Sequence, residues 1–109
     1  MENKPDLMQE IVDYTSKRQY KMPNIWEAMG WVGAEIGEVY EVLLSNDGWV
    51  RNNPEDHPPK DDNDLAEELG DVIFMLMLAG YSKGVNPLEA LKAKMTRKLE
   101  KLNAENQTK

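Results

Sequence analysis

Four acidic residues form two pairs with three-residue spacing, and both pairs lie within otherwise apolar stretches of the chain. Glu35 and Glu38 make the first pair, and Glu68 and Asp71 make the second. Residues three apart on an α-helix lie on the same side, so each pair can direct its carboxylates towards one point. Two such pairs brought together offer the oxygen ligands that divalent cations such as Mg²⁺ prefer. The spacing therefore predicts a cation site between two helices.

The neighbours of both pairs indicate that the acids face apolar side chains. Successive residues of an α-helix are rotated by about 100°. The apolar side chains that point in nearly the same direction as Glu35 are Val32, Val39 and Val42. Those nearest in direction to Glu68 are Leu65, Val72, Met75, Leu76 and Ala79. Burying an unpaired carboxylate is so costly that the group normally becomes protonated, so four converging acids need a metal or basic partners. The alternative is two solvated helix faces with ordinary ion pairs, because most Asp and Glu side chains are exposed.

The remaining composition favours a site built from oxygen ligands. Cysteine is absent and the one histidine is His57, so a zinc site with nitrogen or sulfur ligands is poorly represented. We expect Mg²⁺, with Mn²⁺ as a substitute, to neutralise and orient a bound phosphate chain. A carboxylate of the set that does not bind the metal could then act as the general base.

Basic and aromatic residues elsewhere are candidates for binding the phosphorylated substrate. The candidates are Lys94, Arg97, Lys98 and Lys101 near the C-terminus, Arg51 and Lys60 in a polar segment, and the indoles of Trp31 and Trp49. The cations can bind phosphate oxygens, although a solvated or helix-end role explains Lys94 and Arg97 equally well. An indole can stack on a base, with a core or interface role as the alternative for Trp31 and a local loop contact as the alternative for Trp49.

The bulk composition limits the class of protein. The 109 residues fit a single domain, 1–109, with a core over about 5–102. The formal net charge of −7 argues against binding a nucleic acid polymer or an anionic membrane. The first residues lack the apolar core of a signal peptide, and the apolar run over 72–79 is far shorter than a membrane span. We therefore expect a cytoplasmic protein.

Helix-start signals and apolar spacing divide the chain into four helices. The pairs Asn24 with Glu27 and Asn86 with Glu89 have capping-box spacing, and acids at 61–64 can cap a third start. Gly84 stands where helices commonly end. The expected elements are helices over 5–18, 24–44, 61–83 and 86–102, a loop over 45–63 rich in Asn, Asp, Gly and Pro, and a frayed tail over 103–109.

The apolar pattern predicts an all-α fold that one chain does not complete. The fourth helix carries a stripe of Leu91, Met95, Leu99 and Leu102, and the run over 74–79 is apolar on all sides. We expect Met75, Met77 and Met95 to fill the core. Because the two acid-bearing helices are too apolar for an isolated hairpin, we predict a helical bundle completed by a second subunit.

The ordered motifs are similar to those of the MazG-like family of all-α nucleoside triphosphate pyrophosphohydrolases. The resemblance is carried by the segment 35–39 (EIGEV), then 67–72 (EELGDV), then 91–95 (LKAKM), and it covers roughly residues 24–101. The chain departs from the family pattern at Ala34, where family members often carry a further Glu, and at Lys98 and Lys101, the positions nearest to the family's Asn and Arg.

The resemblance implies a fold, a reaction and a set of site residues. It implies a Mg²⁺-dependent enzyme that cleaves a nucleoside or deoxynucleoside triphosphate to the monophosphate and pyrophosphate, in control of the nucleotide pool. It also implies a four-helix bundle completed by oligomerisation, as a homodimer or homotetramer. The metal ligands and catalytic residues would be Glu35, Glu38, Glu68 and Asp71, with Lys94 as a phosphate contact. Two alternatives stay open: a phosphoribosyl-ATP pyrophosphohydrolase, and a non-catalytic helical interaction module stabilised by a divalent cation.

Overall fold

The computed structural model describes residues 6–18, 21–46 and 60–107, and every regular element in these ranges is an α-helix. The helices are α1 (Leu7–Lys17), α2 (Ile25–Asn46), α3 (Asp62–Tyr81) and α4 (Pro87–Gln107). The prediction of an all-α chain with four helices is therefore confirmed. Within the described ranges, none of these helices combines the length and the apolar character needed to cross a membrane.

Reciprocal side-chain caps begin the two helices that carry the acid pairs. At the start of α2, the Glu27 amide donates to Asn24 Oδ1 at 2.8 Å and the Asn24 amide donates to Glu27 Oε1 at 3.2 Å. At the start of α3, Asp61 and Asp64 make the same exchange, at 3.0 and 2.9 Å. Each exchange satisfies two amides that a helix start otherwise leaves without partners. The predicted capping-box spacing at Asn24 is confirmed.

The predicted bounds of the loop and of the C-terminal tail are wrong. Helix α2 continues through Ser45 and Asn46, and α3 already includes Asn63, so the loop over 45–63 is shorter at both ends than predicted; residues 47–59 lie outside the described ranges. The prediction of a frayed tail over 103–109 is also wrong, because α4 continues to Gln107. Ala, Glu and Gln favour the helix and neither Gly nor Pro interrupts this stretch, so local propensity extends α4 by another turn.

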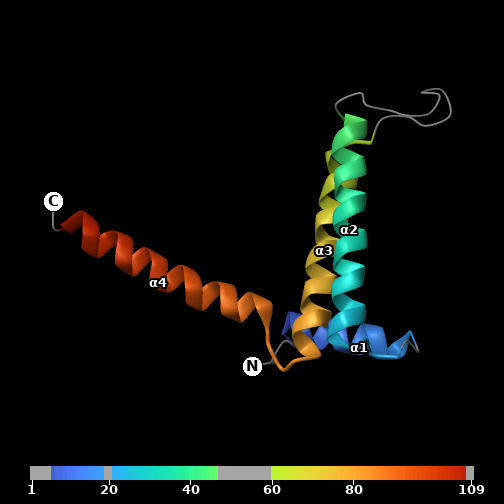
Figure 1. The fold of residues 1–109 in the computed structure, drawn as a ribbon, viewed down its shortest axis with the longest axis horizontal. Helices are drawn as coiled ribbons and strands as arrows, with labels where there is room; N and C mark the ends of the chain where they lie inside the picture. The colour runs from blue at the N-terminus through green and yellow to red at the C-terminus, as the bar shows by residue number, and fades with distance from the viewer. Residues whose placement is uncertain (1–5, 19–20, 47–59, 108–109) are drawn as a thin grey trace, which may run out of the picture.

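The antiparallel pair α2 and α3 is the largest helix–helix interface, and α1 crosses its lower end (Figure 1). Along α2, Ala28, Val32 and Val42 are buried. Beneath them, a core cluster combines buried Ile11 of α1 with Met77 and Leu78 of α3; Met8, Met22, Phe74, Met75 and Leu88 pack against it. The prediction that Met75 and Met77 fill the core is confirmed.

A tight corner joins α3 to α4. The Val85 and Lys83 amides donate to Gly80 O at 2.8 and 2.9 Å, and Gly84 adopts a φ of 71°, a conformation that favours glycine. Asn86 Oδ1 then caps α4 by accepting from the Leu88 and Glu89 amides at 3.0 and 3.2 Å. The corner therefore sets the direction in which α4 leaves the hairpin.

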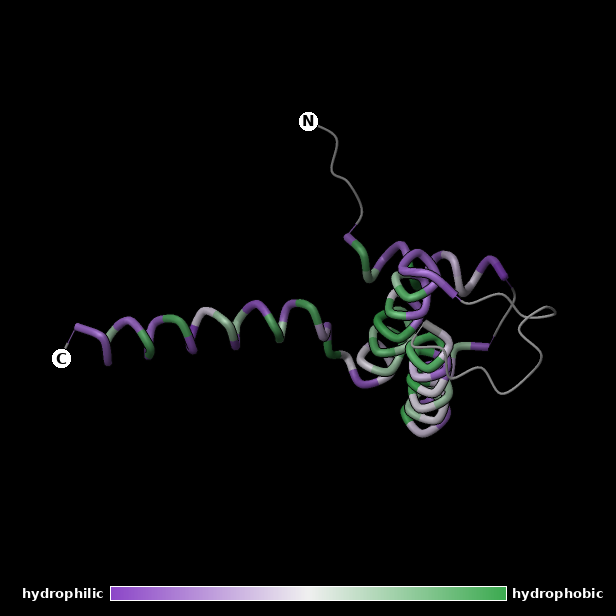
Figure 2. The backbone as a smooth tube through the Cα atoms, turned by 90° about the horizontal axis from the view of Figure 1, so that it is seen from above, coloured by the Kyte–Doolittle hydropathy of each residue, from purple (hydrophilic) through white to green (hydrophobic). Residues whose placement is uncertain are grey.

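Helix α4 projects from the rest of the chain instead of packing along the hairpin (Figures 1 and 2). Its residues from Glu89 to Gln107 are all exposed. Met95 is 43% exposed, so the prediction that it fills the core is wrong within one chain, because no other helix reaches it. The Cα radius of gyration is 18.6 Å, whereas a compact chain of this length has a radius of about 13 Å. Completion of the bundle by another copy stays a prediction.

Candidate metal centre

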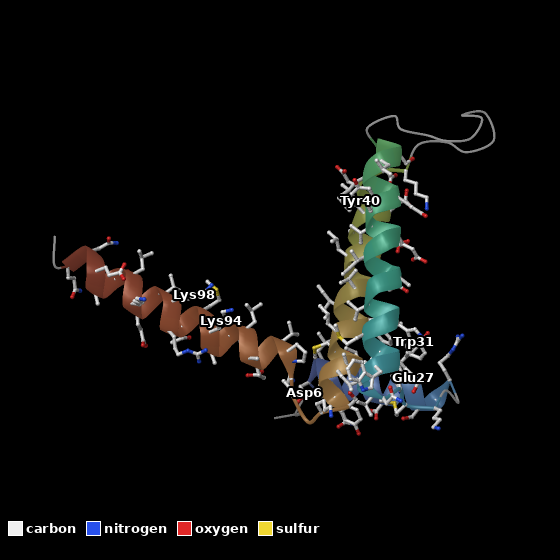
Figure 3. The ribbon with its side chains drawn as sticks, viewed as in Figure 1. Asp6, Glu27, Trp31, Tyr40, Lys94 and Lys98 are labelled. Atoms are coloured by element: carbon white, nitrogen blue, oxygen red, sulfur yellow. The ribbon has the colours of Figure 1, made fainter. Side chains whose placement is uncertain are left out.

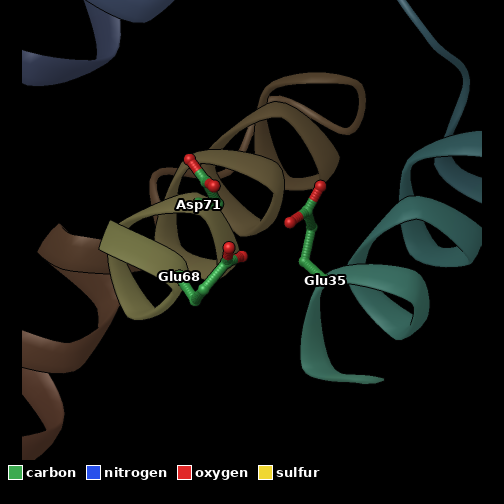
Figure 4. A group of neighbouring side chains, drawn as sticks. All are labelled: Glu35, Glu68 and Asp71. Atoms are coloured by element: carbon green, nitrogen blue, oxygen red, sulfur yellow. The ribbon is translucent and has the colours of Figure 1, made fainter. Parts of the chain in front are cut away.

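Three of the four predicted acids come together between α2 and α3. Glu35 projects from α2, and Glu68 and Asp71 project from α3, towards a common point (Figure 4). One carboxylate oxygen from each residue lies within 4.8 Å of the others. The grouping follows from the hairpin geometry, since Glu35 and Glu68 lie in the contact stripes of two antiparallel helices and Asp71 lies three residues from Glu68.

The cluster contains carboxylate oxygens without partners. Glu35 Oε2 and Glu68 Oε2 are buried and accept no hydrogen bond from any group in the described part of the chain. Burial raises the pKa of Glu35 above its ordinary value of 4.5, and a hydrogen bond to Glu38 and the neighbouring negative charges raise it further. An unsatisfied buried oxygen is costly, so these two atoms are candidates for binding a cation.

Glu38 joins the cluster from its exposed edge. Its hydrogen bond to Glu68 is the main cause that raises the pKa of Glu68 above 4.5, followed by burial and by the charges of Glu38 and Asp71. Lys60 opposes this change by its positive charge. Glu38 is exposed and lies outside the group of three closest ligand atoms. All four predicted acids therefore belong to one cluster, with three at its centre and one at its edge.

The donor set fits a hard divalent cation. Every ligand atom that the cluster offers is a carboxylate oxygen, and the two buried oxygens lack competing protein donors. Mg²⁺ binds through a few carboxylates and keeps water molecules that a phosphate can replace, whereas zinc sites use nitrogen and sulfur ligands. The cluster could therefore hold Mg²⁺ or Mn²⁺ through Glu35, Glu68 and Asp71.

An aromatic cavity adjoins the acids. A hollow of about 420 Å³ is lined by Glu35 and Asp71 together with Tyr14, Phe74 and Met75. The same three non-acidic residues also line a second cavity of about 420 Å³ that reaches Trp31, Arg18 and Lys21. The Tyr14 and Phe74 rings pack edge to face, with centroids 6.0 Å apart. This volume falls within the range of small-molecule sites, so the acids border a space large enough for an aromatic ligand.

The structure places the predicted substrate contacts in three different settings. Trp31 is 43% exposed and lines the second of these cavities, on the hairpin that carries the acids. Lys94, Arg97 and Lys98 lie on α4, which projects away from that hairpin (Figure 3). Within one chain they are not brought to the acid cluster, and their role in binding stays a prediction. Trp49, Arg51 and His57 lie outside the described residues.

Residue spacing did not single out the aromatic lining of the site. Tyr14 fits the helical spacing of the first predicted helix, and Phe74 belongs to a run that is apolar on all sides. Neither pattern shows that the two side chains meet beside the acids, because spacing within one helix does not determine which residues of another helix it contacts. Aromatic residues within one helical turn of Asp71 would have been the available signal.

Comparison of the chain with models of protein families, with curated proteins and with solved structures found no match. A functional assignment therefore depends on the geometry of the acid cluster and its cavity, together with the resemblance of the motifs.

Proposed function

We propose that the chain is a Mg²⁺-dependent nucleoside triphosphate pyrophosphohydrolase, which cleaves its substrate to a nucleoside monophosphate and pyrophosphate. The observation that carries the proposal is the convergence of Glu35, Glu68 and Asp71, with two buried oxygens unpartnered, at the edge of an aromatic cavity. The acids suit a metal-bound phosphate chain, and the cavity suits a base. The order of the motifs, which resembles that of MazG-like pyrophosphohydrolases, supports the same reaction.

Each part of the site would have a distinct role. Glu35, Glu68 and Asp71 would hold the cation, which when bound neutralises phosphate charge and lowers the pKa of a coordinated water. We assign Glu38 as the proton acceptor, because it lies beside Glu35 and Glu68 at the exposed edge of the cluster. Trp31 would stack on the base, and Arg18 and Lys21, which line the same cavity, would attract the phosphates.

The test is pyrophosphate release from a panel of ribo- and deoxynucleoside triphosphates, with and without Mg²⁺. Glu68→Gln removes a charge from the cluster, and Glu67→Gln removes the same charge from the adjacent, exposed position on α3. We expect release that requires the metal, a loss of at least about 100-fold in Glu68→Gln, and unchanged release in Glu67→Gln. Equal activity in both variants would contradict the assignment of the site.

The same panel separates the alternatives. Phosphoribosyl-ATP belongs in it, since turnover of that compound alone would favour the second enzymatic function. A helical module stabilised by a cation predicts a different pattern: Mg²⁺ raises the melting temperature of the wild type and no triphosphate is consumed. The latter result would replace the enzymatic proposal with a structural role for the same three acids.

A further inference from the structure

The second cavity, which we call the indole cavity, is formed by residues of α1, α2 and α3 and of the segment before α2. Its volume is about 420 Å³. Most of its described lining is aromatic or apolar, which suits the two faces of a base. The described lining residues are Tyr14, Thr15, Arg18, Lys21, Trp31, Phe74, Met75 and Leu78. The polar groups among them therefore determine which base edges the cavity can bind.

The charged side chains in the described lining are both basic. They are Arg18 and Lys21. The Arg18 guanidinium lies 5.9 Å from the centre of the Tyr14 ring, so its charge stands beside an aromatic wall of the same cavity. Both side chains donate hydrogen bonds and neither can accept one. Whether they contact a phosphate or the edge of the base, they bring only donors and positive charge to the cavity.

The neutral polar side chains add little capacity to accept a hydrogen bond. Thr15 is only 4% exposed, and its hydroxyl already donates to Ile11 O at 2.8 Å. The Trp31 indole N–H can only donate. The Tyr14 hydroxyl can donate or accept, so it does not distinguish between the two kinds of group. The balance of the described lining is therefore strongly towards donors.

The side chains that commonly recognise an amino group are absent from this described lining. A carboxylate accepts from the amino group of cytosine, and Asn or Gln pairs with the amino group of adenine. Among the described residues around the indole cavity, none is Asp, Glu, Asn or Gln. Glu35 and Asp71 line the first cavity, where the proposed function has them hold the cation. An amino group in the indole cavity would thus meet donors and positive charge.

The bases divide into two classes by the group at this edge. Uracil and thymine carry a carbonyl oxygen where cytosine carries an amino group, and hypoxanthine carries one where adenine carries an amino group. A carbonyl oxygen accepts from a cationic donor, and hydrogen bonds to charged groups are stronger than those between neutral groups. The amino hydrogens carry partial positive charge, so the same cations repel them and leave them without partners. The described lining therefore favours one class over the other.

We infer that the indole cavity selects nucleotides whose base carries a carbonyl group over those that carry an amino group at the same position. The preferred class contains uracil, thymine and hypoxanthine nucleotides. The inference rests on the proposed function for the place where the nucleotide binds, and it adds the chemical class of the base. It depends on the donors of the lining and not on the acids that would hold the metal.

Binding of analogues that resist hydrolysis tests the preference separately from catalysis. The ligands are the α,β-methylene analogues of UTP and CTP, and of ITP and ATP, with Mg²⁺ present. Within each pair the sugar, the phosphate chain and the ring system are identical. Isothermal titration calorimetry should give dissociation constants at least about tenfold lower for the UTP and ITP analogues, because each gains a hydrogen bond to a charged donor.

The outcomes separate this inference from the proposed function. Equal or reversed affinity within the pairs would overturn the base preference, even if all four parent triphosphates are hydrolysed. Preferential binding of the UTP and ITP analogues, without hydrolysis of any parent triphosphate, would support the preference and contradict the enzymatic proposal. Failure of every analogue to bind would overturn both.

Two variants test whether the basic lining is the cause. Arg18→Gln and Lys21→Gln each replace a cation by a side chain that can also accept a hydrogen bond. At least one of them should reduce the ratio of the two affinities about fivefold or more, with helix content retained by circular dichroism. Lys17→Gln removes the same charge from an exposed position on α1 that does not line the cavity, and should leave the ratio unchanged. An unchanged ratio in both lining variants, or an equal reduction in Lys17→Gln, would refute the assignment.

Discussion

Replacing Gly80 with alanine tests the claim that a close-packed corner directs α4. A Cβ at this position would overlap Val85 O and would lie 2.7 Å from Pro87 Cδ. Neither neighbour can move easily, because Val85 is fixed by its hydrogen bond to Gly80 O and the Pro87 ring is rigid. The corner must therefore open for the methyl group to fit.

The expected cost follows from these contacts. Overpacking costs about 1–3 kcal/mol, and loss of the Val85 hydrogen bond costs about 1 kcal/mol. The greater helix propensity of alanine returns about 0.5–1 kcal/mol. We expect Gly80→Ala to lower the free energy of unfolding by about 1–3 kcal/mol, a substantial part of the total for a small domain.

Gly70→Ala is the matched control. Gly70 lies on the same helix, and a Cβ there would meet nothing within 4 Å. This change should raise the free energy of unfolding by about 0.5–1 kcal/mol, so the two variants are expected to differ in sign. The assay is urea unfolding followed by circular dichroism at one protein concentration, since self-association changes apparent stability. A Gly80→Ala protein as stable as Gly70→Ala would refute the close-packed corner.

Two further predictions concern the site. The raised pKa of Glu68 means that the folded chain keeps a proton that the unfolded chain releases, so ionisation of Glu68 lowers stability as the pH rises above 4.5. In metal-free buffer, the melting temperature of Glu68→Gln should therefore rise relative to the wild type between pH 4.5 and 7, and a constant difference would contradict the shift. For binding, Trp31→Ala should raise the KM for nucleotide at least about fivefold, because stacking is worth about 1–3 kcal/mol. Trp26→Ala, at an 84% exposed position on the same helix, should leave KM unchanged.

The sequence was sufficient for the parts of the fold that local interactions decide. Asn24 and Glu27 lie close together in the chain, and their capping exchange depends on little beyond that spacing. The pairing of Glu35 with Glu68 and Asp71 was also predictable, because helical periodicity places them in the contact stripes of neighbouring helices.

The sequence was insufficient where the outcome depends on how elements meet. Met95 has the spacing of a core residue, and its stripe was identified correctly, but periodicity cannot tell whether the covering surface belongs to the same chain. The contact of Tyr14 with Phe74 depends on the angle between packed helices, which the spacing within one helix does not determine. The polar composition of 103–109 predicts a frayed tail, whereas α4 continues to Gln107 because Ala, Glu and Gln in this stretch favour the helix.

The unpartnered oxygens of Glu35 and Glu68 have a consequence for mutational scanning. Val32 and Val42 are buried on either side of Glu35 along α2. An apolar residue at position 35 would therefore make the contact surface between α2 and α3 continuously apolar. A library sorted for folded protein should therefore enrich apolar substitutions at 35 and 68, whereas a library sorted for hydrolysis should deplete them. Opposite selection at the same two positions would locate the site without any knowledge of its ligand.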